Sequence, residues 1–328
     1  MEKIRIGIYG YGNLGKGVET AIKNNPDMEL VGVFTRRDPK TIKTINKETN
    51  VYGTDEVSNM KDKIDVMILC GGSATDLPVQ TPEMASMFNV VDSYDNHANI
   101  PLHFNNVDKV AKENNKLALI SCGWDPGLFS LNRALFEAVL PIGTNYVFYG
   151  RGLSQGHSDA VRRIKGVKKA VQYTVPYEES VRKVRNGEEP RFSSVREVMW
   201  RECFVVLDEN ADEKEVEKEI KEMPNYFEPY NTTVHFISEE EFDKDHVGMP
   251  HGGFVLRSGK TSSNNKQIAE FSLNLDSNPE FTSSVLVAYA RAVYKLSKEG
   301  KNGAVTVLDI PVSYLSTKTK EELLKGTL

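Results

Sequence analysis

Short apolar runs alternate with helix-type spacing at the start of the chain. The run Ile4–Tyr9 predicts a strand, and the segment Asn13–Asn25 carries apolar residues at the spacing of one helix face. Pro26 interrupts this helix, and the run Glu29–Phe34 predicts a second strand. A strand, a helix and a strand in this order form a βαβ unit, in which the two strands lie parallel.

The same alternation continues to residue 122. Further strands are predicted at Asp65–Cys70, Asn89–Asp92 and Lys116–Cys122, with helices at Pro82–Phe88 and Pro101–Asn114 between them. The strands are continuous apolar runs, which indicates a sheet that helices cover on both faces. Residues 1–122 are therefore predicted to form a doubly wound, parallel α/β domain.

The pattern changes after Gly123. A helix is predicted at Phe129–Leu140, and longer strands then follow with few helices between them. These predicted strands are Tyr146–Tyr149, Lys168–Tyr177, Glu202–Leu207, Thr232–Ile237, Gly253–Arg257 and Gln267–Leu275. Such a succession is typical of an α+β domain built on a mainly antiparallel sheet.

Helices of two kinds accompany the later strands. Asp212–Met223 predicts a charged, solvated helix, and Phe281–Gly300 predicts a long amphipathic one. A strand at Val305–Ile310 and a polar helix at Lys318–Lys325 follow it. We expect the last helix to pack back on the first domain, which makes that domain discontinuous.

The composition is that of a globular protein without a basic surface. The chain has 328 residues, of which 39% are hydrophobic and 27% are charged, and its net charge is −5 with a pI of about 5.8. Because phosphate backbones and anionic membranes attract excess basic charge, this balance argues against a nucleic-acid or membrane-surface partner. It does not exclude a local basic pocket.

Three cysteines, Cys70, Cys122 and Cys203, are odd in number and too widely spaced for a disulfide framework or a zinc site. Reduced thiols fit a reducing cytosol. The N-terminal residues lead straight into a strand without a secretory leader, and no apolar run reaches the roughly 18 residues of a membrane span. We therefore expect a cytoplasmic protein.

A glycine-rich motif lies between the first predicted strand and its helix. The segment Gly10-Tyr11-Gly12-Asn13-Leu14-Gly15 has the form G-x-G-x-x-G. In this context the first glycine allows a tight turn, the second lets the backbone approach a pyrophosphate, and the third lets helix and strand pack closely. The start of the helix offers unpaired N–H groups to phosphates. These residues predict a dinucleotide-binding Rossmann domain, although a glycine-rich turn without a ligand has the same pattern.

The second predicted strand ends in Thr35-Arg36-Arg37, where NAD-type sites carry an acidic residue for the ribose 2′-hydroxyl. Arginine grips a 2′-phosphate through charge-assisted hydrogen bonds, whereas an acid repels it. Each such contact is worth roughly 1.5–3 kcal/mol, so two favour the phosphorylated cofactor by roughly a hundredfold or more. We predict NADP(H) rather than NAD(H). The alternative is a pair of solvated arginines, and the sequence leaves open which arginine holds the phosphate.

Small and polar residues follow the next three predicted strands, at the edge of a parallel sheet where ligands bind. Asp95 and Asp125 are candidates for the chemistry at the nicotinamide, although either residue also suits a turn or a cap. The cofactor contacts expected from these strand ends are Cys70, Gly71, Gly72, Ser73, Ser93, Tyr94, Asp95, Cys122, Gly123, Trp124, Asp125 and Pro126.

Two later segments rich in glycine, Gly152–Asp159 and Gly248–Gly253, are predicted to be loops and contain His157 and His251. No histidine belongs to an H-E-x-x-H motif or a Cys/His cluster, so no metal is expected. No Ser/His/Asp order of a catalytic triad can be assigned either. Hydride transfer needs no protein nucleophile, so these features fit a dehydrogenase.

Ten segments occur in order along nearly the whole chain: GYGNLG, FTRR, GGSATD, VDSYDNH, GWDPG, LSQGHSDA, VQYTVP, RECFVV, GMPHGG and NPEFT. In this combination the sequence resembles the meso-diaminopimelate dehydrogenase family. The resemblance implies a homodimeric enzyme that reversibly oxidises the D-configured centre of meso-2,6-diaminopimelate with NADP+. The implied products are ammonia, NADPH and L-2-amino-6-oxopimelate, which cyclises to tetrahydrodipicolinate in lysine synthesis.

The resemblance also implies a division of the chain and a role for particular residues. Residues 1–122 with about 303–328 form the cofactor domain, and residues 123–302 form the substrate-binding and dimerisation domain. Asp95 and Asp125 hold the amine of the D-centre, either as proton acceptors or only as orienting groups. The implied substrate contacts are Trp124 and Tyr149 as a wall, Gln155 and Asp159 in the same cavity, Thr174, Arg201 and His251 at the distal carboxylate, and Asn278 at the L-centre.

Two other functions remain open from the sequence alone. One is a different two-domain NADP(H) oxidoreductase, such as a dihydrodipicolinate reductase-like enzyme, which shares GYGNLG but need not have the later segments. The other is a regulator that binds NADP(H) without turnover. The acidic balance and the lack of an evident helix-turn-helix with a basic face argue against the regulator.

Overall fold

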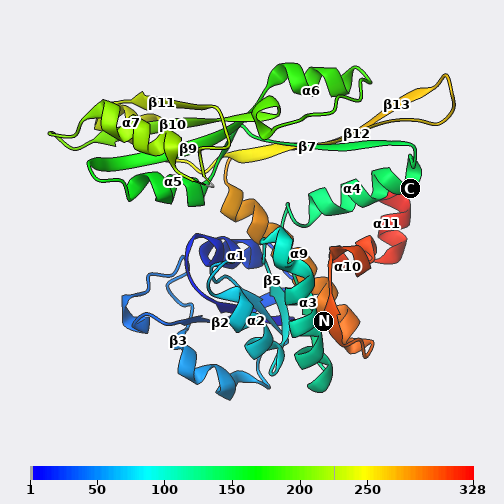
Figure 1. Cartoon of the computed structure of the whole chain (residues 1–328). Helices are drawn as coiled ribbons and strands as arrows, with labels where there is room; N and C mark the ends of the chain where they lie inside the picture. Colours follow the sequence, from blue (N-terminus) through cyan, green and yellow to red (C-terminus); the bar gives the residue numbers. More distant parts are fainter. Residues whose placement is uncertain (1–2, 225) are drawn as a thin grey trace. The chain divides into compact units, whose positions relative to one another are not determined.

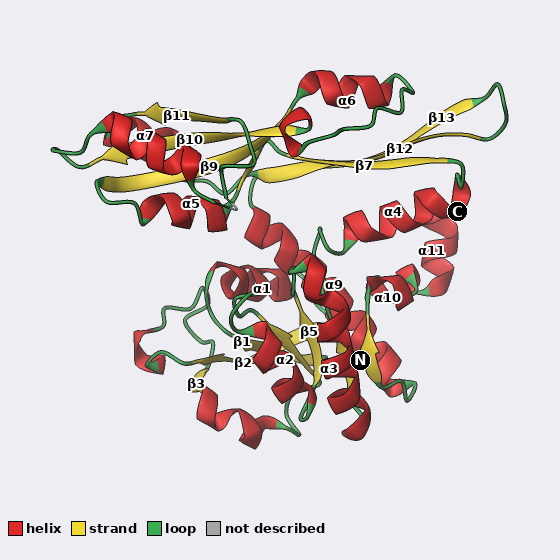
Figure 2. Ribbon diagram, viewed as in Figure 1, coloured by secondary structure: helices red, strands yellow, loops and turns green. Residues whose placement is uncertain are grey.

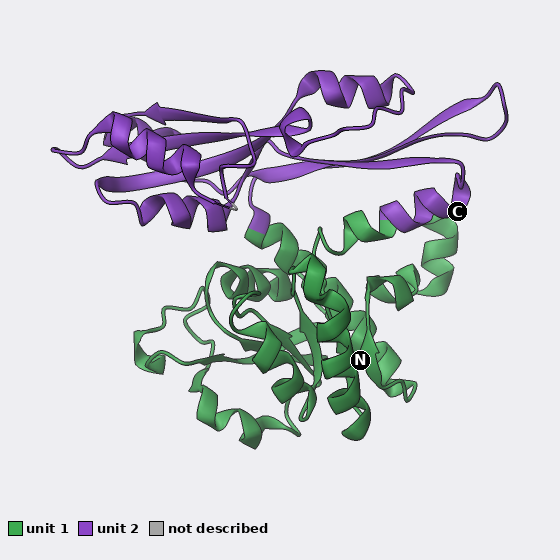
Figure 3. Ribbon diagram, in the orientation of Figure 1, with its two compact units in different colours: residues 1–131, 279–328 green, residues 132–278 purple. Residues whose placement is uncertain are grey.

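A computed structural model describes residues 3–224 and 226–328 of the chain. The fold comprises two compact units, one formed by residues 1–131 and 279–328 and the other by residues 132–278 (Figures 1 and 3). The second unit ends at Asn278, earlier in the sequence than the predicted boundary near residue 302. Helix α9 (Asn278–Lys298) belongs from Pro279 onward to the first unit, because Leu286, Tyr289 and Val293 are buried in one cluster with the first strand.

The first unit contains a seven-stranded parallel sheet in the order β14-β6-β5-β4-β1-β2-β3, which confirms the predicted doubly wound class. The chain builds outward on one side of β1 and then crosses to β4 on its other side. This change of direction creates the position at which such sheets bind nucleotides. The strands are β1 (Ile4–Tyr9), β2 (Met28–Thr35), β3 (Val51–Gly53), β4 (Val66–Leu69), β5 (Asn89–Asp92), β6 (Leu117–Leu119) and β14 (Gly303–Val305).

Helices cover both faces of this sheet, as the apolar strands require (Figure 2). Consecutive residues of β4 point to the two faces: Ile68 packs in the same cluster as Leu286 of α9, and Met67 packs in the other cluster, with Leu77. The helices of the unit, besides α9, are α1 (Asn13–Lys23), α2 (Leu77–Ala85), α3 (Ile100–Glu113), α10 (Val312–Leu315) and α11 (Lys320–Thr327).

The second unit contains two sheets where the sequence predicted one. Every strand pair is antiparallel except β10 with β11, which is parallel. One sheet has the order β11 (Thr232–Phe236), β10 (Met199–Leu207), β9 (Val167–Pro176) and β8 (Gly152–Leu153). The other has the order β13 (Lys266–Leu275), β12 (His251–Lys260) and β7 (Gly143–Tyr149).

More helices separate these strands than the sequence predicted. Helix α4 (Leu128–Val139) leads into the second unit, and the others are α5 (Gln155–Arg162), α6 (Glu178–Arg185), α7 (Glu213–Glu222) and α8 (Glu239–Asp245). The two segments predicted as glycine-rich loops contain regular structure, since Gln155 begins α5 and His251 begins β12. Helices of seven or eight residues are too short for their apolar spacing to be distinctive.

Two boundaries differ from prediction for local reasons. The predicted strand Val305–Ile310 ends at Val305, because Thr306 and Asp309 form a capping box that starts a 3₁₀ turn. Helix α2 begins at Leu77 rather than at Pro82, since Pro78 lies in its first turn, where a missing N–H costs nothing.

Among the described residues, no helix combines the length and the apolar character needed to cross a membrane.

Candidate active site

A cavity of about 240 Å³ lies in the first unit at the carboxyl ends of β1, β2 and β4. It therefore occupies the position at which the chain changes direction in the sheet. The residues predicted for the cofactor that line it are Gly10, Tyr11, Gly12, Thr35, Arg36, Arg37, Cys70, Gly71 and Gly72. The sequence did not predict five others: Tyr9, Phe34, Thr54, Asp76 and Gln80.

The glycines of the first turn shape this cavity. Gly10 has a φ of +97°, which favours glycine, and a Cβ at Gly15 would lie 2.3 Å from the Gly10 carbonyl oxygen. A Cβ at Gly12 would meet no atom within 4 Å, so the space beside this residue is open. No side chain caps helix α1 at Gly12. This turn fits a pyrophosphate, which would bind the N–H groups at the helix start.

The two arginines at the end of β2 have different partners. Arg36 forms a two-pronged ion pair with Asp76, with N–O distances of 3.0 and 3.1 Å, and its side chain is 66% exposed. Arg37 donates from Nη2 to the Tyr11 carbonyl oxygen at 2.6 Å. The Gly72 amide, followed by Arg36, lowers the pKa of Asp76. A 2′-phosphate that binds Arg36 must therefore compete with an ionised carboxylate.

Glu19 is a buried acid that the sequence did not single out. Its carboxylate accepts hydrogen bonds from the Tyr11 hydroxyl, the Thr49 hydroxyl and the amides of Ile45 and Asn46. Burial opposes ionisation, but these donors together lower the pKa of Glu19. Glu19 thereby fixes Tyr11 of the glycine-rich turn to the loop that precedes β3.

The two candidate catalytic aspartates follow adjacent parallel strands, β5 and β6. Asp95 is exposed, and its amide donates to the Ser73 hydroxyl at 2.8 Å. Asp125 is half-buried in a turn in which the Phe129 amide donates to the Trp124 carbonyl at 2.8 Å. Because the carboxyl ends of adjacent parallel strands meet at one sheet edge, both acids belong to the same edge.

The other cofactor residues predicted from the sequence do not line the cavity. Cys122 is 1% exposed, and burial raises the pKa of its thiol well above the usual range, so this side chain is an inert core group. The remaining residues of this kind are Asn13, Leu14, Gly15, Ser73, Ser93, Tyr94, Asp95, Gly123, Trp124, Asp125 and Pro126.

Arg201 is a buried cation in the second unit. It is 6% exposed and lies opposite Thr174 in the β9–β10 pair, where its Nη1 donates to the Thr174 hydroxyl. The Tyr230 ring lies 3.8 Å from the guanidinium carbon. None of the described carboxylates pairs with this guanidinium, and its Nε has no hydrogen-bond partner. Burial lowers the pKa of Arg201, which indicates the cost of holding this charge away from water.

His251 begins β12 in the same unit, and its ring packs against Gly152, where a Cβ would lie 2.4 Å from Nδ1. Burial lowers the pKa of His251, so the ring is neutral near pH 7. The Gly252 amide lies 2.8 Å from Nδ1, the shorter of two contacts to that residue. This geometry makes Nδ1 the acceptor of the Gly252 amide and leaves the ring proton on Nε2.

The other predicted substrate residues have partners within the second unit. Asp159 is paired with Arg162 on α5, and Gln155 Nε2 lies 3.2 Å from the Met249 sulfur. The Asn278 amide donates to the Met249 carbonyl at 2.9 Å, and Tyr149 ends β7. These four residues and Arg201, Thr174 and His251 all belong to the second unit, whereas Asp95, Trp124 and Asp125 belong to the first.

The environment of His157 predicts a stability that depends on pH. Burial, followed by the Arg201 charge, lowers the pKa of His157 to about 4, against about 6.5 in an unfolded chain. The unfolded state therefore binds more protons between these values, so this contribution is fully present above pH 6.5 and decreases as the pH falls towards 4. Its full size is at most about 3 kcal/mol.

We expect His157→Gln to flatten the decline of the free energy of unfolding between pH 6.5 and 4, as measured by urea denaturation at several pH values. Some decline should remain, because burial also lowers the pKa of His251. A variant that loses stability as steeply as the wild type would contradict this assignment.

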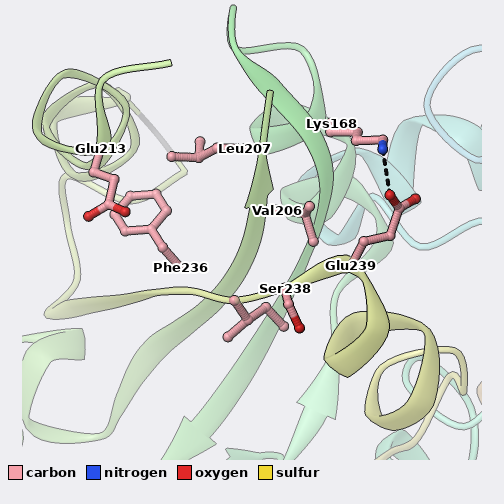
Figure 4. A pocket seen from close by; sticks show the side chains of 8 residues that line it. Lys168, Val206, Leu207, Glu213, Phe236, Ser238 and Glu239 are labelled. Carbon is pink, nitrogen blue, oxygen red and sulfur yellow. Dashed lines mark hydrogen bonds and ion pairs between the residues drawn. The ribbon is translucent and has the colours of Figure 1, made fainter. Parts of the chain in front are cut away.

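A second hollow, of about 420 Å³, lies in the second unit between the end of β10 and the start of α8. Figure 4 shows Lys168 and Glu239 paired at its rim, beside Val206 and Ser238. None of the predicted site residues lines this hollow. Within the described part of the chain, no group of three or more His, Cys, Asp or Glu residues is arranged to hold a metal ion.

Known proteins resemble this chain over its whole length. The family model for the C-terminal domain of diaminopimelic acid dehydrogenase matches residues 123–277. The chain is 63% identical to the meso-diaminopimelate D-dehydrogenase of Ureibacillus thermosphaericus over 328 residues, which is 100% of both proteins.

Solved structures agree with this match. The C. glutamicum DAP dehydrogenase in complex with DAP has a TM-score of 0.90 and 44% identity, with 100% of both chains covered. An engineered D-amino acid dehydrogenase bound to NADP+ has a TM-score of 0.85 and 43% identity, with 99% of this chain and 100% of that chain covered. These comparisons confirm the resemblance carried by the ten sequence segments. The chain belongs to the family of meso-diaminopimelate D-dehydrogenases.

Proposed function

We propose that this enzyme catalyses the reversible, NADP-dependent oxidative deamination of meso-2,6-diaminopimelate at its D-configured centre. The products are ammonia, NADPH and L-2-amino-6-oxopimelate, which cyclises to tetrahydrodipicolinate, an intermediate of lysine synthesis. Full-length identity of 63% to a dehydrogenase of this name supports the assignment. A dihydrodipicolinate reductase-like activity and a non-catalytic regulator have no comparable support.

The observation that carries the substrate assignment is the buried, unneutralised guanidinium of Arg201. A cation buried without a carboxylate destabilises a fold, so its retention indicates an anionic ligand. A dicarboxylic amino acid supplies this anion at the end remote from its reacting centre. Thr174 and His251 are proposed to bind the same carboxylate.

The cavity of the first unit fits NADP(H). The open space at Gly12 and the uncapped start of α1 suit the pyrophosphate, and Arg36 and Arg37 suit the 2′-phosphate. When bound, the nicotinamide accepts a hydride from the D-centre. A relative with 43% identity has been solved bound to NADP+.

Asp95 and Asp125 are proposed to hold the amine of the D-centre. Departure of a hydride needs the lone pair of the amine, so the ammonium group must first lose a proton. A neighbouring carboxylate accepts this proton directly or through water, or else both acids only orient the substrate. Trp124 and Tyr149 are proposed as the wall of this site, with Gln155, Asp159 and Asn278 as further substrate contacts.

The test of the function is NADP+ reduction with the three stereoisomers of diaminopimelate. We expect turnover with the meso isomer, none with the L,L isomer, which lacks a D-centre, and slower turnover with the D,D isomer, whose distal centre is inverted. Equal rates with all three isomers, or no reaction with the meso isomer, would contradict the proposal.

The arginine pair predicts the cofactor preference. We expect Arg36→Ala and Arg37→Ala each to raise the KM for NADP+ by about 10- to 100-fold, because each variant removes a charge-assisted contact worth roughly 1.5–3 kcal/mol. The kcat at saturating NADP+ and the KM for NAD+ should change little. As a control, Asp76→Asn should leave the KM for NADP+ unchanged or lower it, because the 2′-phosphate then no longer competes with a carboxylate for Arg36. An unchanged KM for NADP+ in both alanine variants would exclude the pair.

We further propose a homodimer in the cytoplasm. The family resemblance supports the dimer, and so do three apolar side chains that lie exposed in the single chain: Leu135 at 57%, Val139 at 65% and Ile142 at 69%. Cys70, Cys122 and Cys203 are free thiols, which suit a reducing compartment. Sedimentation velocity should report about twice the chain mass of 36.8 kDa. A species of 36.8 kDa at all concentrations would contradict the dimer.

A further inference from the structure

Asp92 is a buried acid that the proposed reaction does not use. It is the last residue of β5 and is 0% exposed. Its Oδ1 accepts hydrogen bonds from the amides of Tyr94 and Ser121, at 3.0 and 2.7 Å. Its Oδ2 accepts from the Thr81 hydroxyl at 2.7 Å and from His103 Nε2 at 2.8 Å. One carboxylate thus has four hydrogen bonds in the core of the first unit.

The two oxygens of Asp92 connect different parts of the fold. The amides on Oδ1 belong to the two segments that follow β5 and β6, and these segments contain Asp95 and Asp125. The donors on Oδ2 belong to helices α2 and α3, which cover one face of the sheet. The Asp92 carbonyl also accepts the Cys122 amide at 2.9 Å. Asp92 therefore ties both acid-bearing segments to the rigid layer of helices.

The segment after β6 is held by its hydrogen bonds to Asp92. Ser121 has a φ of +56°, a left-handed conformation that is disfavoured for a residue with a Cβ. Its buried hydroxyl has no hydrogen-bond partner, so its own side chain does not hold the turn. Its amide donates to the Asp92 side chain and the next amide, of Cys122, donates to the Asp92 carbonyl, and the turn then leads directly to Trp124 and Asp125.

The segment after β5 is held at two points. The Tyr94 amide donates to Asp92, and the Tyr94 ring stacks on His103 with 4.2 Å between the ring centroids. His103 is 4% exposed and donates from Nε2 to the same carboxylate. Tyr94 is thereby fixed through both backbone and side chain, one residue before Asp95.

We propose that Asp92 is a positioning residue of this enzyme, which holds Asp95 and Asp125 in the geometry that hydride transfer requires. It acts only through the two segments and contacts neither substrate nor cofactor. Positioning of this kind matters because displacements of about 1 Å at reacting groups can lower a rate a hundredfold. The inference rests on the proposed roles of Asp95 and Asp125.

The test compares Asp92→Ala with Asp92→Asn. The asparagine keeps an oxygen that accepts the Tyr94 and Ser121 amides. Its NH₂ group can donate to His103 Nε2 when the ring carries its proton on Nδ1. The alanine leaves both amides without an acceptor. We expect Asp92→Ala to lower kcat about 100-fold and Asp92→Asn to lower it less than fivefold. In the alanine variant the deuterium isotope effect on kcat, with the D-centre labelled, should rise because hydride transfer becomes rate-limiting.

Two measurements separate positioning from a purely structural role. The first is a titration with NADPH, followed by its fluorescence. The affinity for NADPH should stay within about threefold of the wild-type value, and the stoichiometry gives the number of folded sites. The second is Trp124 fluorescence in a Trp200→Phe background, which removes the only other tryptophan. Acrylamide should quench Trp124 more strongly in the alanine variant. The matched control is Leu296→Ala, a buried residue of α9, which should lower the melting temperature and leave kcat per NADPH site unchanged.

An unchanged kcat per NADPH site in Asp92→Ala would overturn the proposal, and so would unchanged quenching of Trp124. If the alanine variant does not fold, Thr81→Val decides, because it removes one hydrogen bond from Oδ2 and changes no residue of either segment. A fall in kcat of about threefold with stronger quenching would support the proposal, and wild-type values of both would overturn it. The quenching result stands even if the wild type does not oxidise meso-diaminopimelate, so failure of the proposed function is seen separately.

Discussion

Asp125→Asn is expected to lower kcat for oxidation of meso-diaminopimelate by about 10²- to 10⁴-fold, the usual range for loss of a group that transfers a proton. Asp95→Asn is expected to have a similar effect. Each substitution keeps the size of the side chain and removes the carboxylate that is proposed to hold the ammonium group. The measurement is steady-state NADP+ reduction with the meso isomer at saturating cofactor.

The controls for this pair are NADPH affinity and the melting temperature. Both should stay near the wild-type values, because neither carboxylate lines the cavity at Gly10–Gly12. The pH profile of kcat/KM distinguishes the two possible roles. Loss of the acidic limb in one variant would identify that aspartate as the proton acceptor, whereas an unchanged shape would indicate an orienting group. Wild-type turnover in both variants would remove these residues from the site.

Arg201→Ala is expected to lower kcat/KM for meso-diaminopimelate by about 150- to 4,000-fold, mostly through KM. The loss reflects the roughly 3–5 kcal/mol that removal of one partner from a buried charge pair costs. Discrimination against D-amino acids without a distal carboxylate should decrease at the same time. Arg201→Lys is the matched variant, because it keeps the charge but loses the planar fork, and it should retain part of the affinity.

Stability provides an independent test of the same residue. Without substrate, Arg201 is a buried cation that no described carboxylate neutralises, so Arg201→Met should raise the melting temperature while it abolishes binding of the diacid. A variant with unchanged substrate affinity, or with a lowered melting temperature, would count against the role of Arg201 as an anion receptor.

Sites made from neighbouring residues were predictable from the sequence. The turn Gly10–Gly15 and the arginines at the end of β2 lie within single βα connections, so glycine spacing and strand order were enough to place them beside one cavity. Their partners were not predictable. Asp76 forms an ion pair with Arg36, which lies 40 residues away in the sequence. Glu19 accepts a hydrogen bond from Thr49, which lies 30 residues away. No local pattern marks either acid.

The buried polar groups show the same limit. The antiparallel register of β9 and β10 brings Thr174 opposite Arg201, 27 residues apart, and this register exists only once the sheet has formed. Asp92 looked like an ordinary strand-end residue, and its four hydrogen bonds come from segments as far as 29 residues away. A carboxylate acquires such a role only when several elements fold around it.

The sequence by itself determined the class of fold, the cofactor type and the family, because apolar periodicity, glycine spacing and ordered motifs are written along the chain. Only the tertiary structure decided which unit contains α9, since its apolar face had two possible partners and the first-unit cluster buries Leu286 and Tyr289. Tertiary structure also decided which charges are neutralised, with Arg36 paired and Arg201 buried without a carboxylate. Pairing and burial depend on distances in space, which residue order alone does not specify.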